Sequence, residues 1–306
     1  MRKYIIRFFA FLALFFVIDR AAGFVLNYIA ENPRGGMTLR RNYINDHCHE
    51  DVLVFGSSRA HYHYNPKVVT DSLGLSCYNC GENANGIILF YAWWKMITQR
   101  YYPKLLIYDV HSLYDVLEGD NYSFLQILKR FSDKDCVKPI INDVDPNEHW
   151  KLHCMMYRYN SIFTELAADF ISPVKSDTSD GFIPLQGHVN TKHVKGKPAH
   201  SDHELKFDSL KHSYLEKLIK ERGTTQLVFV VSPMFEGMNP AVFEPVEKLC
   251  RQYGIIFLNY VNDPKYKGNI DYFKDLTHLN AEGADVYTRQ LMKDLKPLLK
   301  GDDEKQ

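Results

Sequence analysis

Short apolar runs alternate with amphipathic stretches along most of the chain. The apolar runs have the length of single strands and occur at 51–55, 104–110, 226–231 and 254–258, and a short stretch at 76–79 is also interpreted as a strand. Stretches with apolar residues at helical spacing follow them, at 65–73, 86–100, 204–221, 240–253 and 281–299. Strands that are regularly followed by helices are typical of a parallel sheet covered on both faces. The pattern predicts an α/β fold with a central five-stranded parallel sheet.

The alternation fails between about 113 and 203. This stretch is rich in Asp, Asn, His and Lys and holds aromatic clusters, such as the one at 153–159. We interpret it as an insertion, part helix and part loop, over the face of the sheet that carries the candidate site. Insertions of this kind often select the substrate.

The N-terminus has the pattern of a membrane-targeting segment. Three basic residues within the first seven precede an apolar run at 8–18, which Asp19-Arg20 interrupts before a second, mostly apolar stretch at 21–30. No small-x-small cleavage site follows the run, so we interpret 1–30 as an uncleaved signal anchor with its positive end in the cytoplasm. A cleaved signal peptide is the alternative. The polar stretch 31–50 is expected to be a linker, followed by a domain at 51–300 outside the inner membrane.

Charge and cysteine content narrow the function classes. The 37 basic and 37 acidic residues cancel, and no basic stripe is present, so a nucleic-acid partner is not expected. Six cysteines are compatible with disulfides outside the cytoplasm, but their spacing prescribes no pairing. Cys77-x-x-Cys80 stands alone, and the histidines, including His61 and His63 with strand-like alternation, follow no zinc motif. We expect neither a metal nor a cofactor.

The candidate chemistry lies at the two ends of the domain. Ser58 follows the first apolar run, and Asp275 precedes His278 by three residues far downstream. A serine hydroxyl becomes a nucleophile when a histidine takes its proton and a carboxylate orients that histidine. Ser58 falls just past a strand end, where sites of parallel sheets lie, as do Gly81 and the stretch 109–112. The alternative is that Ser58 is a small turn residue and that Asp275 caps the final helix.

These motifs resemble the first and last sequence blocks of the SGNH/GDSL hydrolase superfamily. The first block is read here as Gly56-Ser57-Ser58, with Ser57 in place of the usual Asp, and the last as Asp275-x-x-His278. The resemblance, which covers about 50–112 and 225–295, implies a three-layer α/β/α, flavodoxin-like fold. It assigns Ser58 as nucleophile, His278 as base and Asp275 as its orienting acid.

The oxyanion-binding residues match the superfamily less completely. Gly81 matches the glycine of the second block, whose N–H helps hold the oxyanion. The third block, Gly-x-Asn-Asp, has no counterpart at 105–112, so its asparagine donor is missing or replaced. Asn83, Asp109 and His111 are the candidates for oxyanion or substrate binding. Arg59 is expected to pair with a surface acid.

The resemblance to envelope-anchored members implies a serine esterase or O-acyltransferase. Its substrate is expected to be an ester-linked acyl group, acetyl foremost, on a cell-envelope glycan. Two alternatives stay open: a lipase or small-ester hydrolase, and a catalytically idle scaffold that binds glycan during polysaccharide modification or export.

Overall fold

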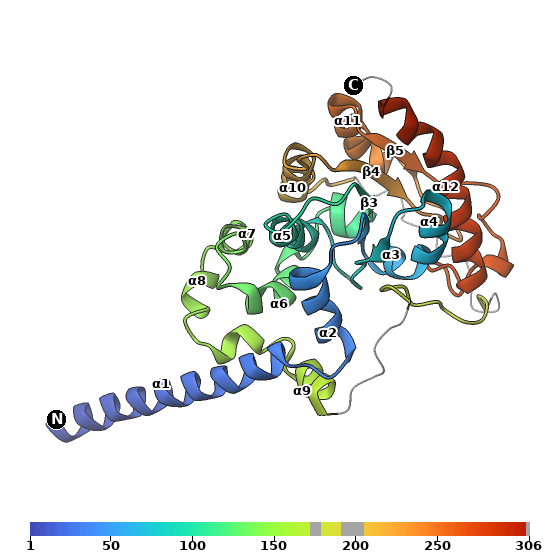
Figure 1. Ribbon diagram of the computed structural model, residues 1–306. Coiled ribbons are helices and arrows are strands. Elements are labelled where there is room, and N and C mark those ends of the chain that lie inside the picture. The colour runs from blue at the N-terminus through green and yellow to red at the C-terminus, as the bar shows by residue number, and fades with distance from the viewer. Residues whose placement is uncertain (172–178, 191–204, 304–306) are drawn as a thin grey trace. The chain divides into compact units, whose positions relative to one another are not determined.

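The computed structural model describes residues 1–171, 179–190 and 205–303, with backbone alone for 300–303. The chain forms two compact units (Figure 1). Unit 1 consists of Met1–His47 and the described part of 121–176, and unit 2 of Cys48–Asp120 and the described part of 177–306. The described part of the expected insertion is therefore divided. Residues 121–171 belong to unit 1, whereas 179–190 and the chain from 205 belong to unit 2, and 172–178 and 191–204 lie outside the described residues.

Unit 2 is built on a five-stranded, fully parallel sheet. Its strands are β1 (Val52–Gly56), β2 (Cys77–Asn79), β3 (Leu105–Asp109), β4 (Gln226–Val231) and β5 (Ile256–Asn259). Their spatial order is β2-β1-β3-β4-β5, the flavodoxin-like order. Together with helices on both faces and an apolar N-terminal helix, this confirms the predicted α/β fold.

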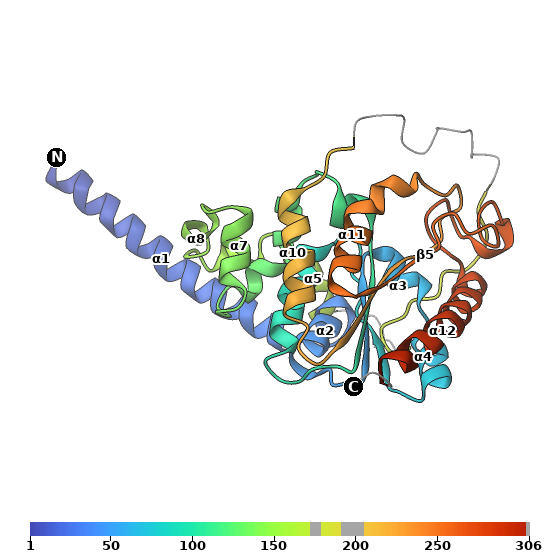
Figure 2. The same ribbon diagram turned by 90° about the horizontal axis from the view of Figure 1, so that it is seen from above.

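Helices cover both faces of the sheet (Figures 1 and 2). The helices over one face are α3 (Ser58–His63), α4 (Pro66–Leu73) and α12 (Ala281–Asp303). Those over the other are α5 (Ile87–Ile97), α10 (Ser209–Lys220) and α11 (Glu244–Tyr253). Three short turns complete the unit: η2 (Ser112–Val116), η7 (Pro240–Phe243) and η8 (Ile270–Tyr272).

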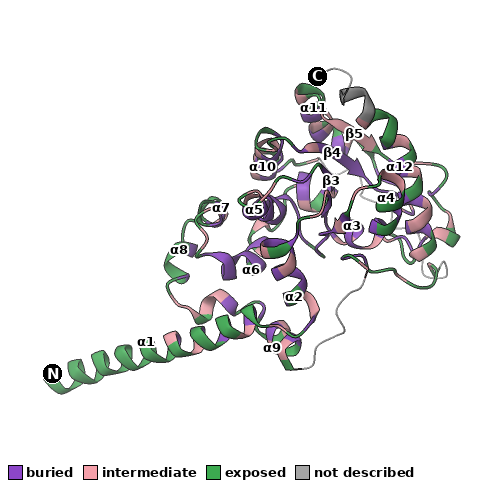
Figure 3. Cartoon of the chain, viewed as in Figure 1, coloured by how far each residue is buried: buried purple, intermediate pink, exposed green. Residues whose placement is uncertain are grey.

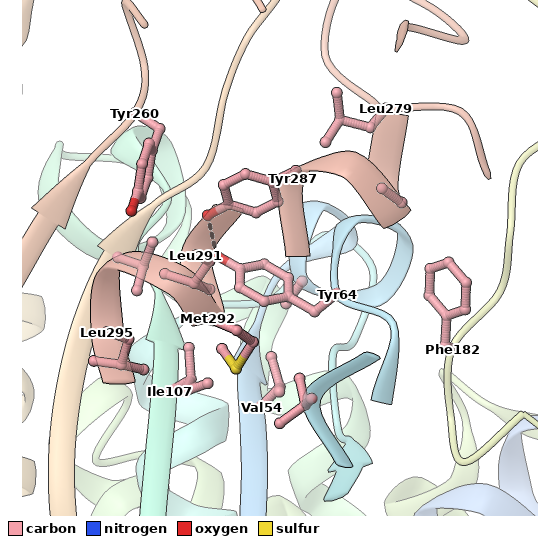
Figure 4. Packing of buried hydrophobic residues seen from close by; sticks show 14 of the residues in the cluster. Val54, Tyr64, Ile107, Phe182, Tyr260, Leu279, Tyr287, Leu291, Met292 and Leu295 are labelled. Carbon is pink, nitrogen blue, oxygen red and sulfur yellow. Dashed lines mark hydrogen bonds between the residues drawn. The ribbon is translucent and has the colours of Figure 1, made fainter. Parts of the chain in front are cut away.

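The core beneath α12 and α4 holds these elements in register. Side chains from alternate strand positions, such as Val54 and Ile107, pack against Leu291 and Met292 of α12 (Figure 4). The hydroxyls of Tyr64 and Tyr287 are hydrogen-bonded within this apolar layer at 3.1 Å. Burial of this apolar surface fixes α12 on the sheet, and α12 follows directly on the segment that carries His278.

Element ends depart from the sequence prediction where side chains cap the backbone. The helix expected from 204 begins at Ser209, because the Asp208 carboxylate accepts hydrogen bonds from the N–H groups of Leu210 and Lys211. The stretch 240–253 divides into η7 and α11. The alternation of His61 and His63 suggested a strand, but both residues lie on the helix α3.

Unit 1 consists of helices and helical turns. They are α1 (Arg2–Glu31), α2 (Gly36–Asn42), η1 (Tyr43–His47), η3 (Asn121–Phe124), α6 (Leu125–Leu128), η4 (Lys129–Phe131), α7 (Lys138–Val144), α8 (Glu148–Lys151), η5 (Met156–Tyr159) and α9 (Phe163–Ile171). The stretch 31–50, expected to be a linker, holds α2 and η1. The α2 segment is bonded into the unit: the N–H of Thr38 donates to Asp169, and Arg130 donates to Asn42.

The two halves of α1 have different surroundings (Figure 3). The N-terminal half is exposed along its length, whereas Leu26 and Ala30 pack against Tyr159, Ile162 and Leu166. Among the described residues, α1 is the one helix both long and apolar enough to cross a membrane.

Candidate active site

A sharp turn after β1 places Ser58 at the start of a helix. Gly56 has φ of 138°, and a Cβ there would lie 2.7 Å from the carbonyl oxygen of Asp109 on the adjacent strand. Glycine is therefore required at this position. Ser57 is extended and buried, and Ser58 opens α3 with its side chain only partly covered. Its N–H is one of the first-turn amides that have no partner within the helix.

The fold brings Ser58, His278 and Asp275 into one hydrogen-bonded chain. The Nε2 atom of His278 lies 2.8 Å from the Oγ of Ser58, and its Nδ1 lies 2.9 Å from Oδ2 of Asp275. If Nδ1 carries the proton toward the carboxylate, Nε2 is left to accept from the serine hydroxyl. This is the tautomer that a general base requires.

Asp275 also shapes the loop that presents the imidazole. Its Oδ1 accepts hydrogen bonds from the N–H groups of Thr277 and His278, each at 2.8 Å. Partial burial acts to raise the pKa of Asp275, but the hydrogen bonds from His278 and Thr277 outweigh it and lower the pKa below its ordinary value. The group therefore stays ionised opposite the ring. The capping role and the orienting role, alternatives in the sequence, are combined in one carboxylate.

A second histidine ties the His278 loop to the serine helix. His63, on α3, accepts at Nε2 a hydrogen bond of 2.9 Å from the N–H of Leu279, the residue after His278. Its Nδ1 therefore carries the proton and donates to the Ser232 hydroxyl at 3.1 Å. Burial, aided by electrostatic repulsion from the neighbouring His278 and Arg59 side chains, holds the pKa of His63 well below its ordinary value. His63 is thus a neutral link between two loops.

Asp109 completes this buried network and does not reach the surface. Its carboxylate accepts from both the N–H and the hydroxyl of Ser232, each at 2.9 Å, and lies 3.7 Å from the guanidinium of Arg59. Burial raises the pKa of Asp109, against the effect of Arg59 and Ser232. The structure therefore does not fit the expectation that Asp109 binds substrate. Its carboxylate is fully buried and binds Ser232, which follows β4, and Arg59.

Arg59 is also placed differently from the sequence expectation. It was expected to pair with a surface acid, but its side chain is 1% exposed. It is held by Asp109 and by the carbonyl oxygen of Val110. Arg59 and Asp109 are therefore a buried pair beneath Ser58, in which each charge provides the partner that a buried charge requires.

The backbone N–H of Gly81 already has a hydrogen-bond partner within the protein. Its N–H donates to Oδ1 of Asn79 at 2.9 Å, so donation to an oxyanion would require this bond to be given up. A Cβ on Gly81 would lie 2.3 Å from the backbone nitrogen of His61, so glycine here permits α3 to approach β2. Asn79 also donates to the carbonyl oxygens of Ala60 and Tyr64 at the end of α3.

Asn83 is linked to the His278 imidazole by Tyr62, a residue that no sequence motif marks. Its Nδ2 donates to the hydroxyl of Tyr62 at 2.7 Å, and the ring of Tyr62 meets that of His278 edge-on, with centroids 5.3 Å apart. Tyr62 stands one helical turn after Ser58. Asn83 is therefore connected to the site and exposed on its rim.

His111 makes several contacts within its own segment. Its Nδ1 accepts from the N–H of Leu113, its own N–H donates to Asp115, and its ring stacks on Tyr114 with centroids 4.4 Å apart. Burial raises the pKa of Asp115 to about 6. His111 thus helps to form the turn that follows β3.

Three residues that hold the site were not recognised from the sequence: His63, Asn79 and Ser232. A usable signal existed for one of them. Once Ser58 is placed at a helix start, His63 belongs to the same short helix and can reach the neighbouring loop. No pattern in the sequence marks Asn79 or Ser232, because their partners are far away along the chain.

Neither the cysteines nor the histidines form a recognisable metal or redox centre in the described part of the chain. All six cysteines are free thiols, and Cys77 lies within the core beneath α12 and α4. Burial raises the pKa of the Cys77 thiol well above its ordinary value, which is typical of an unreactive thiol. Within 1–171, 179–190 and 205–303, no three His, Cys, Asp or Glu side chains gather as metal ligands would.

Comparisons with known proteins find resemblance to solved structures alone. No family model and no curated protein matches the chain. An acetyl xylan esterase (Est2A) from the rumen bacterium Butyrivibrio proteoclasticus aligns with a TM-score of 0.37 and 8% identity. The alignment covers 81% of this chain but only 64% of that one, just under two thirds. A Streptococcus pneumonia protein whose description refers to platelet activating factor aligns with a TM-score of 0.36 and 13% identity, covering 92% and 98%. Similarity of this size says nothing about a shared activity.

Proposed function

We propose that this protein is a serine esterase or O-acyltransferase that acts on ester-linked acyl groups. The observation that supports this most is the chain of hydrogen bonds from Ser58 through His278 to Asp275, at 2.8 and 2.9 Å. All three side chains are partly exposed, so an ester can approach the serine. Ser58 lies at the start of α3, just past the end of β1, where sites of parallel sheets are found, whereas Asp275 and His278 lie together in the segment between η8 and α12.

In the proposed reaction, Ser58 attacks the ester carbonyl carbon while His278 takes the hydroxyl proton at Nε2. Asp275 stabilises the imidazolium that forms, without itself taking a proton. Collapse of the tetrahedral intermediate breaks the bond to the alkoxide, which receives the proton from His278. Water or a sugar hydroxyl, deprotonated by the same histidine, then attacks the acyl-enzyme. Collapse of the second tetrahedral intermediate breaks the bond to Ser58, whose oxygen takes the proton back from His278, and releases the acid or the new ester.

For the oxyanion we propose the backbone N–H of Ser58 as one donor and the side-chain amide of Asn83 as a second. The first-turn position of Ser58 leaves its N–H without an intrahelical partner. Asn83 is exposed, and its contact with Tyr62 places it on the rim beside His278. Gly81 remains the donor that the superfamily resemblance favours, at the cost of its bond to Asn79.

The substrate class and location rest on the resemblance to the SGNH/GDSL superfamily and on α1. We propose an O-acetylated envelope glycan as substrate and a single-pass inner-membrane location, with the domain in the periplasm. Hydrolysis and transfer share the acyl-enzyme and differ in the acceptor that reaches it. The lipase and the idle glycan-binding scaffold are the competing interpretations.

A fluorophosphonate probe tests the nucleophile directly. The full-length protein in detergent should be labelled on Ser58, and labelling should be lost in Ser58→Ala. Ser57→Ala is a matched control, because the Ser57 hydroxyl is buried and has no hydrogen-bond partner among the described residues. A protein that the probe leaves unlabelled would be the idle scaffold, and equal labelling of Ser58→Ala would show that another residue is the nucleophile.

Turnover of a chromogenic acetyl ester gives the corresponding kinetic prediction. Ser58→Ala should reduce kcat by at least about 10³-fold, since the covalent route is lost. Its melting temperature should stay close to that of the wild type, because the side chain is small and partly exposed. Full activity in Ser58→Ala together with an inactive Ser57→Ala would reassign the nucleophile.

A further inference from the structure

The apolar, exposed part of α1 is too short to cross a bilayer by itself. Residues 4–18 extend for about 22 Å, whereas the hydrocarbon core measures about 30 Å. Beyond Arg20, α1 continues with Phe24, Val25 and Tyr28 exposed, while Leu26 and Ala30 face the rest of unit 1. If α1 enters the membrane, its boundary therefore falls beside the folded part of unit 1.

Unit 1 buries the Asp19 carboxylate and binds Arg20, the two charged residues that interrupt the apolar run. The Asp19 carboxylate, 2% exposed, accepts hydrogen bonds of 2.9 Å from the N–H groups of Met155 and Met156. The thiol of Cys154 donates to the same carboxylate, and Arg20 donates to the carbonyl oxygen of His153. A carboxylate at this depth needs such donors, because lipid offers none. The segment 153–156 supplies them from the protein.

The residues just before this segment present an unusual exposed aromatic side chain. Trp150, on α8, is 69% exposed, and Met156 is also exposed. Trp150 stands three residues before His153, whose carbonyl oxygen binds Arg20, so it lies near the level of the Asp19-Arg20 pair. Figures 1 and 2 both show α8 on one side of α1, level with the middle of that helix.

We propose that the segment 148–159 of unit 1 lies in the headgroup region of the bilayer that α1 enters, with Trp150 as its anchor. Tryptophan is enriched at this boundary, where the ring is in contact with acyl chains and the indole N–H with water. The interaction surface continues the apolar face of α1 and fits a phospholipid bilayer. The proposal rests on the proposed membrane insertion of α1.

The chain carries its own reporter for this contact. Of its three tryptophans, Trp93 and Trp94 are fully buried and Trp150 is exposed. The full-length protein is reconstituted into phosphatidylcholine–phosphatidylglycerol vesicles whose acyl chains are brominated at a shallow position. We expect strong quenching of the wild-type emission and little quenching in Trp150→Phe, which keeps an exposed aromatic side chain and removes the reporter. Acrylamide in the aqueous phase should quench Trp150 weakly.

The controls separate this surface from the proposals on which it rests. If the protein stays in the vesicles after carbonate extraction but acrylamide, and not bromolipid, quenches Trp150, α1 is inserted and the surface proposal is overturned. Loss of the protein from the vesicles would overturn the insertion of α1 and this surface with it. Quenching by bromolipid in a protein that a fluorophosphonate leaves unlabelled would support the surface and refute the esterase.

Discussion

At the scale of single residues, the geometry ranks the contributions of His278 and Asp275. His278 is the group that moves the proton, so His278→Gln should lower kcat by several orders of magnitude. Asp275→Asn keeps a hydrogen-bonding side chain beside Nδ1 but removes the charge, and should lose less. Initial rates with an acetyl ester measure both. Near wild-type kcat in His278→Gln would mean that another group serves as base.

His63 is predicted to position His278 without touching substrate. His63→Gln can still accept from the N–H of Leu279, whereas His63→Asn can still donate to Ser232 but is too short to reach Leu279. We expect kcat to fall about 10-fold or more in His63→Asn and less in His63→Gln, with KM little changed. Equal losses in the two variants would show that the Leu279 contact is not what matters.

The same residue predicts a dependence of stability on pH. An unfolded chain protonates this imidazole below about pH 6.5, while the folded protein, whose His63 pKa is lower, leaves it neutral. The free energy of unfolding should therefore fall as pH drops below 6.5, by up to about 1.4 kcal/mol per pH unit, and be unaffected by His63 above it. Between pH 7.5 and 5.5, the melting temperature of the wild type should fall further than that of His63→Gln.

At the scale of elements, α3 is held in place by one buried asparagine. Asn79→Ala would leave the carbonyl oxygens of Ala60 in α3 and of Tyr64 just after it, and the N–H of Gly81, without their partner. Buried groups of this kind cost about 1–3 kcal/mol each when left unpaired, so we expect a loss of at least about 2 kcal/mol. Thermal melts of the full-length protein measure this. Asn269→Ala, which removes only the cap of η8, is the control and should cost about 1 kcal/mol or less.

At the scale of the whole molecule, the prediction concerns placement. Positive charges precede the apolar part of α1, and unit 1 binds its second half through Asp19 and Arg20. We expect the intact chain to remain with membranes after carbonate extraction, and protease added to spheroplasts to digest unit 2. A soluble form beginning near residue 22 to 31 would indicate a cleaved signal peptide. Protection from the protease would place unit 2 in the cytoplasm and remove the main support for a glycan substrate.

Local patterns in the sequence determine much of this protein. Four of the five strands of the sheet are apolar runs, and the helix predicted at 65–73 is present as α4, which Asn65 caps and Gly74 ends. These features depend on neighbours within a few residues, so a single sequence contains the information. The candidate residues Ser58, Asp275 and His278 were also selected from motifs, and the structure brings their side chains together.

The tertiary structure decided what depends on distant partners. The polar stretch 31–50 resembles a linker, yet Arg41 is buried against Glu165, and the backbone N–H of Thr38 donates to the carboxylate of Asp169. Asp109 lies at the carboxyl end of β3, where a binding residue would be expected, but Arg59 and Ser232 hold its side chain in the interior. Most buried polar side chains are satisfied by another part of the chain, and local pattern carries no record of such partners.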